Sequence, residues 1–311
     1  MSDQLPLIAA VELGGTKCVC LLGSGPDAIV DRRRIPTGAP DETLAAIEAV
    51  LDGWQAGSRP FAALGIASFG PADVDPRSKT WGGILATTKP GWEGTDVAGR
   101  LRRRYAVATG FDTDVNGAAL AEGRWGAARG LLDFAYITVG TGIGVGLITG
   151  GRTIGGFSHA EAGHLRIGRV PGDDWPGACA FHGDCVEGLA SGPAIAARLG
   201  RDPASVTADD EVWPLVAQAL AQLLHNLVLT AAPRRILIGG GVMQAQPHLF
   251  PMIRAALGQS LNGYVTLPAG EFVQPPGLGD MAGPCGGIAL GLDARGADPS
   301  DREEEDVRHS A

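Results

Sequence analysis

The stretch LIAAVELGGTKCVCLL, residues 7–22, joins two short apolar runs through a glycine-rich segment. Residues 7–12 and 18–22 have the length and composition of buried strands, and GGTK between them is typical of a tight turn. Residues 28–35 could supply a third strand. The stretch therefore predicts the beginning of a β-sheet.

A helix and further strands extend this pattern. Residues 41–54 begin with Asp41, a suitable cap, and have the apolar spacing of an amphipathic helix. The apolar runs at residues 61–67 and 106–111 predict two more strands. Strands interrupted by a helix in this order indicate an α/β unit and not a β-sandwich.

The same arrangement occurs again in the second half of the chain. Residues 134–139 and 145–149 are apolar and flank GTGIG, much as the first two runs flank GGTK. We interpret this as a weak internal repeat, although a chain with 48 glycines could repeat the motif by chance. The repeat predicts two similar α/β lobes, over residues 1–118 and 119–283.

Three further stretches follow in the second half. Residues 212–229 carry an apolar stripe at helical spacing, and a strand is predicted at residues 235–238. The stretch GPCGGIALGLDA predicts a helix of small residues, at about residues 284–295, that packs closely back on the first lobe. The acidic tail at residues 296–311 has almost nothing to bury, and we expect it to be disordered.

Composition restricts the class of protein. The net charge of -9 argues against nucleic-acid binding, and the basic triplets at residues 32–34 and 102–104 are interpreted as solvated faces. No run approaches the ~20 apolar residues of a membrane span, and no secretory signal is seen, so a cytoplasmic protein without a membrane partner is expected. Cys18 and Cys20 are interpreted as core thiols, and no disulfide framework is expected.

Three glycine-rich segments could each bind a phosphate or a nucleoside. Backbone N–H groups and a hydroxyl can face a phosphate where side chains do not obstruct them, and the alternative is an ordinary turn. No Walker A sequence occurs in the chain, and the second segment lacks the spacing of a Rossmann fingerprint. The candidate residues are Gly14, Gly15, Thr16 and Lys17, then Gly140, Thr141, Gly142 and Gly144, and finally Gly240 and Gly241.

The stretch GFDTDVNGAALAE places Asp112, Asp114 and Asn116 between a predicted strand and an alanine-rich helix. Most Asp and Asn residues at such a position are helix caps. A carboxylate at the end of a strand is also where a general base for a hydroxyl nucleophile would lie. Asp114 is the better candidate, because Asn116 follows closely and could orient a polar substrate.

The stretch AGHLRIGRVPGDDWPGACAFHGDC, residues 162–185, gathers four potential metal ligands. Two nitrogen and two sulfur ligands suit a tetrahedral zinc ion, with a structural role because protein fills all four positions. The alternative is a chance group of polar and core residues. Residues 168–183 are rich in Gly, Pro and Asp, so the metal is expected to order them. The four ligands are His164 and the C-x-x-H-x-x-C motif of Cys179, His182 and Cys185.

Seven segments together resemble a known family. They are VELGGTK (11–17), IASFGP (66–71), TDVNGAALAE (113–122), VGTGIG (139–144), HAEAGH (159–164), CAFHGDC (179–185) and ASGPAI (190–195). The chain resembles the ROK kinases, named for repressors, open reading frames and kinases, and within them the zinc-containing bacterial fructokinases. Glu12 stands where glucose-specific members carry Asp. TTKPGW at residues 87–92 resembles the fructokinase pattern, with Thr88 in place of a common Pro.

The resemblance implies two actin-like, ribonuclease-H-like α/β lobes around a central cleft. It implies an ATP-dependent kinase acting on the 6-hydroxyl of fructose, with mannose or glucose as alternative acceptors. Asp114 would be the base, and Asn116, Glu161 and His164 would contact the sugar. The three glycine segments and Pro193 would bind ATP. Structural zinc on the four ligands, Mg²⁺ with ATP and a homodimer complete what the resemblance implies.

Two other classes of protein stay open at this point. Some members of the family are sugar-responsive regulators with an N-terminal helix-turn-helix module, for which the few residues before Gly14 leave no room. A non-catalytic module that binds sugar or zinc is the other alternative. The presence of Asp114 and of two phosphate-type turns argues against it.

Overall fold

The computed structural model of the chain describes residues 5–201 and 206–296. The expected disordered tail lies outside the described residues from residue 297 on. The described residues form two compact units, one of residues 5–125, 155–159 and 280–296, and the other of those within 126–154 and 160–279.

Helix α3 (Asp114–Trp125) lies entirely in the first unit. The boundary expected after residue 118 would fall inside this helix, whereas the unit continues to residue 125. Helix α3 packs on helix α9 (Ala282–Gly296), where Gly117 and Gly286 bring the two backbones into direct contact. The short segment 155–159 belongs to the same unit, because His159 Nε2 accepts the N–H of Ala72 at 3.1 Å.

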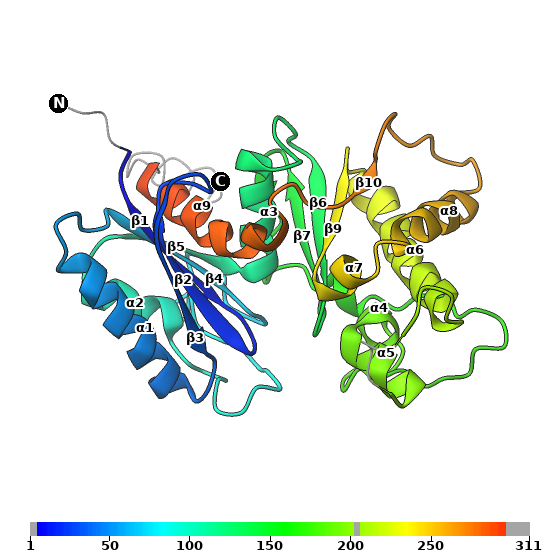
Figure 1. Ribbon diagram of the computed structural model, residues 1–311, viewed down its shortest axis with the longest axis horizontal. Helices are drawn as coiled ribbons and strands as arrows, with labels where there is room; N and C mark the ends of the chain where they lie inside the picture. Colours follow the sequence, from blue (N-terminus) through cyan, green and yellow to red (C-terminus); the bar gives the residue numbers. More distant parts are fainter. Residues whose placement is uncertain (1–4, 202–205, 297–311) are drawn as a thin grey trace, which may run out of the picture. The chain divides into compact units, whose positions relative to one another are not determined.

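A five-stranded sheet with helices on both faces forms the core of the first unit (Figure 1). β1 lies at the centre, with antiparallel β2 and β3 on one side and parallel β4 and β5 on the other. Because strand side chains alternate, Ala9 and Val11 face α1 and α2, while Ala10 and Glu12 face α9. The elements are β1 (Ile8–Leu13), β2 (Lys17–Gly23), β3 (Ile29–Pro36), α1 (Pro40–Gln55), β4 (Ala63–Ser68), α2 (Val97–Tyr105) and β5 (Ala108–Thr113).

The prediction of a small-residue helix packed closely on the first lobe is confirmed by α9. A Cβ added at Gly65 in β4 would lie 1.8 Å from Gly287 O and 2.5 Å from Gly291 N. Both contacts are to backbone, which cannot rotate away as a side chain can. The small residues of α9 therefore let its backbone lie directly on the sheet.

We expect Gly65→Ala to lower the free energy of unfolding by about 3 kcal/mol or more, because the new methyl group overpacks a rigid contact. The measurement is chemical denaturation of the purified protein. Gly53→Ala is the matched control, since Gly53 is exposed in α1 with nothing near its Cβ, and it should stabilise by about 0.5–1 kcal/mol. Equal midpoints for Gly65→Ala and the wild type would contradict this packing.

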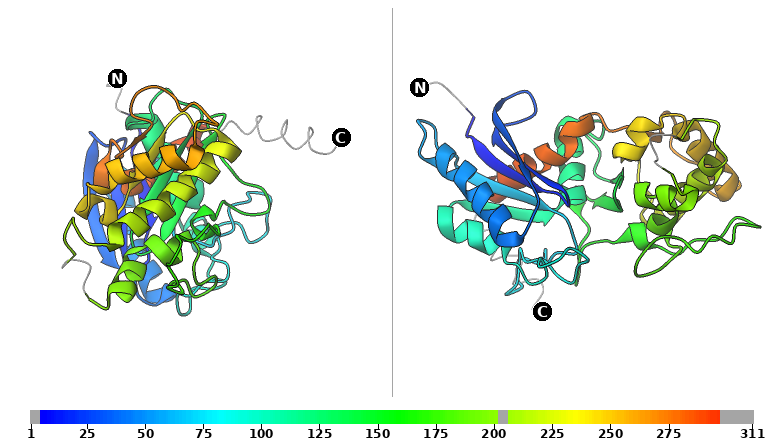
Figure 2. Two further views of the ribbon diagram at one scale, coloured as in Figure 1. Left: turned by 90° about the vertical axis from the view of Figure 1, so that its right-hand side faces the viewer. Right: turned by 60° about the horizontal axis from the view of Figure 1, so that its bottom comes forward.

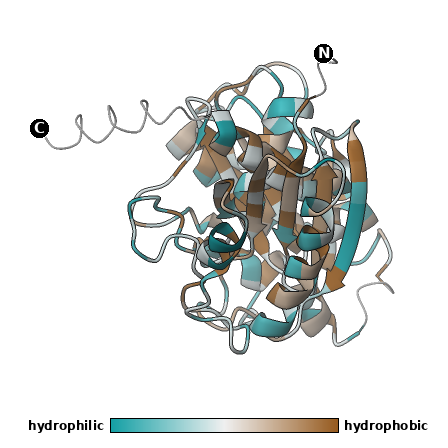
Figure 3. Ribbon diagram, turned by 90° about the vertical axis from the view of Figure 1, so that its left-hand side faces the viewer, coloured by the Kyte–Doolittle hydropathy of each residue, from teal (hydrophilic) through white to brown (hydrophobic). Residues whose placement is uncertain are grey.

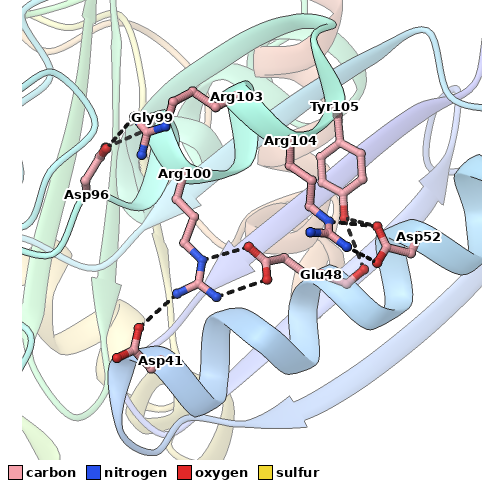
Figure 4. A network of polar contacts seen from close by, with 9 residues as sticks. All are labelled: Asp41, Glu48, Asp52, Asp96, Gly99, Arg100, Arg103, Arg104 and Tyr105. Carbon is pink, nitrogen blue, oxygen red and sulfur yellow. Dashed lines mark hydrogen bonds and ion pairs between the residues drawn. The ribbon is translucent and has the colours of Figure 1, made fainter.

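Ion pairs join α2 to α1, side by side in the first unit (Figure 4). Arg100 binds both oxygens of Glu48 (2.7 and 3.0 Å) and one oxygen of Asp41 (2.9 Å). Arg104 binds both oxygens of Asp52 in the same way (2.9 and 2.6 Å). The second basic triplet is thus a surface face of α2 whose charge is partly neutralised by α1.

The first basic triplet lies in β3, the edge strand of its sheet. Arg32, Arg33 and Arg34 are exposed, and Figure 3 shows the middle of this strand as hydrophilic between hydrophobic ends. Charges in an edge strand discourage pairing with a strand of another molecule. The prediction of a solvated face is confirmed for both triplets.

The second unit repeats the topology of the first. Its central strand β6 has antiparallel β7 and β8 on one side and parallel β9 and β10 on the other, so the predicted internal repeat is confirmed. Helices α6 and α8 pack side by side in this unit (Figures 1 and 2). The elements are β6 (Phe134–Val139), β7 (Ile143–Thr149), β8 (Arg152–Thr153), α6 (Val212–Ala231), β9 (Ile236–Gly239), α8 (Leu249–Leu261) and β10 (Val273–Gln274).

Helix α6 corrects one expectation. Its 20 residues carry no charge, and by length and composition alone it could cross a membrane, so the chain does contain a run of that kind. Within this helix, however, 61% of the most apolar 18-residue stretch is buried. Leu220, Leu223 and Leu224 are fully enclosed in the core of the second unit. These burial values are those of a core helix.

Candidate functional site

The first glycine turn, residues 14–16, joins β1 to β2. Gly14 N–H donates to Lys17 O (3.1 Å), and Thr37 Oγ1 donates to Gly14 O (2.8 Å), which holds the turn in shape. Gly15 and Thr16 are exposed, and their N–H groups have no acceptor within the described part of the chain. Two such amides, with a hydroxyl and the Lys17 ammonium nearby, form a donor set suited to phosphate.

Asp114 is the first residue of α3 and follows β5 directly. Thr113 Oγ1 accepts the N–H of Asn116 (3.2 Å), so Thr113 provides the helix cap that was the alternative role for the acidic residues. Asp114 is half-buried, and its Oδ1 accepts the N–H of Val115 (2.9 Å).

Asn116 has a different environment from Asp114. It is 3% exposed, and its Nδ2 donates to Asp112 Oδ1 at 2.7 Å. Asp112 in turn accepts the N–H of Thr113 (2.7 Å), so the pair holds the junction between β5 and α3. The amide group that could orient a substrate is therefore bound to Asp112.

Glu12 in β1 joins these residues, although in the sequence only its resemblance to one branch of the family marked it. Burial, followed by the negative charge of Asp114, raises the pKa of Glu12 to about 7. Its carboxylate also lies at the start of α9, where a Cβ on Gly283 would be 2.1 Å from Oε1. Two neighbouring carboxylates in the unit that carries a phosphate-type turn are suitable ligands for Mg²⁺. The signal in the sequence that could have identified Glu12 as a site residue is an acidic side chain within an otherwise apolar strand.

The raised pKa of Glu12 makes stability depend on pH. Because the folded chain holds this proton more tightly than the unfolded chain, the stabilisation is present below about pH 4.5 and is lost as the pH rises toward 7. The shift corresponds to roughly 3 kcal/mol. We expect the Tm without Mg²⁺ or nucleotide to fall more steeply from pH 5 to pH 8 in the wild type than in Glu12→Gln. Parallel curves would contradict this, and exposed Glu42→Gln serves as the control.

The second glycine turn, residues 140–142, joins β6 to β7. Gly140 N–H donates to Gly142 O (2.9 Å), and Thr141 is exposed at the tip. Gly144 lies in β7, paired with Thr138, so the predicted cluster continues as strand. The turn thus has the same place in the second sheet as the first turn has in its own.

Three predicted nucleotide-binding segments meet in the second unit. Gly140 O accepts the N–H of Gly192 (2.8 Å), which begins α5 (Gly192–Leu199) with Pro193 next. Gly240 follows β9 with a φ of +92°, and a Cβ there would lie 2.4 Å from Val139 O. Only glycine fits that approach, and it leads into α7 (Gly241–Ala245). The segments separated in sequence therefore end beside the same turn.

The four candidate metal ligands come together in the second unit. The ligand atoms of His164, Cys179, His182 and Cys185 all lie within 4.8 Å of one another and could hold a metal ion. Cys179 and Gly183 exchange two backbone hydrogen bonds (3.1 and 2.9 Å), which closes the loop that carries His182. Burial raises the pKa of the Cys185 thiol to about 11, so metal binding there would displace a proton.

The distances within the cluster fit a tetrahedral ion. With bonds of about 2.3 Å to sulfur and about 2.05 Å to nitrogen, such an ion places two nitrogens about 3.3 Å apart and a nitrogen and a sulfur about 3.6 Å apart. The two histidine Nδ1 atoms are 3.3 Å apart. His164 Nδ1 lies 3.6 Å from each cysteine sulfur, and His182 Nδ1 lies 3.7 Å from Cys179 Sγ. The donor set and its spacing both suit zinc.

The 3-10 helix η1 (Ala162–His164) sets His164 against the second turn. Gly163 touches β7 so closely that a Cβ would be 1.7 Å from Ile143 O. Glu161, just before η1, is exposed, and its carbonyl oxygen accepts the N–H of His164 (3.0 Å). The predicted sugar contacts Glu161 and His164 therefore lie together beside the β6–β7 connection.

Glu187 links the four candidate ligands to the second turn, and nothing in the sequence motifs singled it out. It lies in α4 (Val186–Ala190), whose N-cap is the candidate ligand Cys185. Its Oε2 accepts the N–H of Ile143 (3.0 Å), and its Oε1 is 3.9 Å from His164 Nε2. The only signal in the sequence for Glu187 is its position two residues after the candidate ligand Cys185.

The loop before the cluster is ordered by ion pairs as well as by the candidate ligands. Asp173 pairs with Arg198 (2.7 Å) and Arg169 (3.0 Å), and these arginines hold its pKa at about 2. Arg169 also donates to Trp175 O (2.7 Å) and Asp184 (3.2 Å). These ion pairs order part of the loop, and the expectation that a metal orders it stays a prediction.

Comparisons with known proteins cover both units. The ROK family profile matches residues 8–294. A putative fructokinase of Bacillus subtilis (strain 168) is 42% identical over 302 residues, 96% of this chain and 99% of that protein. A fructokinase of Pediococcus pentosaceus is 40% identical over 285 residues, 91% of this chain and 97% of that protein. The ROK hexokinase of Thermus thermophilus superposes with a TM-score of 0.76 at 25% identity, over 94% of this chain and 100% of that one.

Proposed function

The chain belongs to the ROK family, has the actin-like fold of two α/β lobes, and acts, we propose, as an ATP-dependent fructokinase. It transfers the γ-phosphoryl group of ATP to the 6-hydroxyl of D-fructose. The observation that carries this proposal is the position of Asp114, at the junction of β5 and α3 in the unit of the first glycine turn, where its charge acts on Glu12. A fructokinase at 40% identity and a putative fructokinase at 42% identity, both matched over nearly the whole chain, support fructose as the acceptor.

Asp114 accepts the proton of the sugar hydroxyl as its oxygen attacks the phosphoryl group. One carboxylate is enough, because phosphoryl transfer depends mainly on positioning and on neutralisation of charge. Mg²⁺ bound with the nucleotide would supply part of that neutralisation. Glu12 is the carboxylate that would help to hold it.

The glycine segments bind the nucleotide in this proposal. Gly15 and Thr16 donate their N–H groups to the terminal phosphates, and Lys17 adds a positive charge. The second turn and Pro193 at the start of α5 bind the remaining phosphates, while Gly240 and Gly241 leave bare backbone for the nucleoside. These last two segments are supported by their contact with the second turn.

Candidate sugar contacts are proposed in each unit taken by itself. Glu161 and His164 bind hydroxyl groups in the second unit, and Glu187 joins them because it lies beside His164. In the first unit, Asn116 acts mainly by holding Asp112 and the start of α3, as its buried hydrogen bond indicates.

The metal cluster holds a structural zinc ion in this proposal. His164 binds the ion through Nδ1, which leaves Nε2 toward Glu187 and the sugar. The ion would do no chemistry on the substrate, but it would fix the orientation of the His164 ring. A homodimer, a cytoplasmic location and mannose or glucose as other acceptors stay predictions.

The test is ADP production from Mg-ATP with fructose, mannose, glucose, glucosamine or N-acetylmannosamine, on protein purified without chelator and analysed for zinc. The position of the phosphate on the product is read by NMR. Fructose-dependent turnover with about one zinc per chain supports the proposal. Turnover with another sugar overturns the choice of acceptor, and no turnover with any sugar overturns the kinase assignment.

A further inference from the structure

The loop between β4 and α2 holds Lys89 in a fixed place. Trp92, three residues on, is 2% exposed, its Nε1 donates to Gly38 O (3.1 Å), and its ring meets Phe69 edge-on at 5.2 Å. Trp92 N–H also donates to Lys89 O (3.3 Å). The buried Trp92 indole thus anchors the loop that carries Lys89.

The ammonium group of Lys89 lies against the first glycine turn. Nζ donates to Gly15 O (3.2 Å) and lies 4.8 Å from the centre of the Phe69 ring. A Cβ on Gly15 would be only 2.2 Å from Nζ, so the glycine makes room for the ammonium. An ammonium has three donors, and after these two contacts one N–H has no acceptor within the described ranges.

Lysine is a rare choice in this chain, which has three lysines against 22 arginines. Lys79 is exposed, while Lys17 and Lys89 both lie at the first turn. Lysine carries a compact point charge, which needs less space beside the turn than the wide guanidinium fork of arginine. Burial lowers the pKa of Lys89 and the negative charge of Asp114 raises it, so the ammonium is within the electrostatic influence of Asp114.

We propose that Lys89 binds the γ-phosphate of ATP and stabilises the phosphoryl group while it passes to the sugar. The proposal rests on the kinase function above. Lys89 touches the turn at which the proposal places the phosphates, and the negative charge of Asp114 acts on its ammonium. The ammonium is therefore placed to bind the phosphoryl group that is transferred.

The step balances without a further reactant. The bond from the γ-phosphorus to the bridging oxygen of ADP breaks, and a bond from the γ-phosphorus to the sugar oxygen forms. The hydroxyl proton goes to Asp114, and Lys89 stays protonated throughout. Its contribution is charge neutralisation in a partly dry site, as for other fixed donors in phosphoryl transfer.

The test compares Lys89→Met, Lys89→Arg and the control Lys79→Met in the full chain. Calorimetry measures the affinities for Mg-ADP, for Mg-AMPPNP as a non-hydrolysable probe with three phosphates, and for fructose. We expect Lys89→Met to weaken Mg-AMPPNP about 10-fold or more and to lower kcat about 100-fold. Affinities for Mg-ADP and fructose should stay within about 2-fold of the wild type, because in this proposal Lys89 interacts only with the γ-phosphate, which both lack. Lys89→Arg should recover part of kcat.

Other results separate this proposal from the kinase function. Equal losses for Mg-ADP and Mg-AMPPNP would mean that Lys89 only shapes the turn, and a selective loss for fructose would make it a sugar contact. Either result overturns the proposal while fructose turnover by the wild type upholds the kinase. A wild type that binds neither nucleotide overturns both. Unchanged kcat in Lys89→Met overturns the proposal alone.

Discussion

Asp114→Asn is expected to lower kcat for fructose phosphorylation by about 1,000-fold, within the range that general bases contribute. Asparagine has the size of aspartate, and its oxygen can still accept the N–H of Val115, so the start of α3 keeps its shape. It cannot take up the hydroxyl proton. The measurement is ADP release at saturating fructose and Mg-ATP.

The control for this variant is Asp27→Asn, which alters an exposed carboxylate in the same unit. It should keep wild-type turnover. Tm and zinc content should match the wild type in both variants, which separates lost chemistry from lost folding. A kcat for Asp114→Asn within about 3-fold of the wild type would show that another group takes the proton.

Loss of the metal is expected to weaken fructose binding strongly. In His182→Gln one of four ligands is gone, so zinc should fall well below about one per chain. The ring of His164 then loses the bond that orients it, and with it the contact toward Glu187 and the sugar. We expect the Kd for fructose to rise about 10-fold to 100-fold, in line with the losses of metal affinity or activity that follow when the partners of a metal ligand are changed.

His225→Gln is the matched control, because His225 lies in α6 and bonds to Ser260 of α8, outside the cluster. Chelator treatment of the wild type should weaken fructose binding to the same extent, and added zinc should restore it. The Arg169–Asp173–Arg198 ion pairs keep part of the loop in place, so the metal-free protein should stay folded with a lower Tm. Full fructose affinity in protein verified to lack zinc would sink the structural role of the metal.

Several elements were predictable because their signals are local. The strands around both glycine turns are short apolar runs, and α1 has apolar residues at helical spacing. Both patterns can be recognised from a few neighbouring residues, because the buried side chains of each element follow its period. Helix α2 was not predicted. It has three consecutive arginines and few buried residues, and it is held by carboxylates of α1 about 50 positions away in the chain. Such pairing cannot be recognised from the segment alone.

The candidate site divides in the same way. The grouping of the four candidate metal ligands was predictable, because three of them share a loop whose spacing already resembles a binding site and the fourth lies close upstream. Asp114 and the two turns were predicted because strand ends and glycines mark them. Their roles in catalysis and nucleotide binding stay predictions until the variants are measured.

The amino-acid sequence by itself determined where the chain turns, which residues could bind a metal and which carboxylate follows a strand, because these features depend on spacing over a few residues. Only the tertiary structure decided which groups surround Glu12, Glu187 and Lys89. Desolvation and Coulomb interactions depend on which atoms lie within a few ångströms, whatever their distance along the chain. The raised pKa of Glu12, the contact of Glu187 with both His164 and Ile143, and the contact of Lys89 with Gly15 all arise in this way.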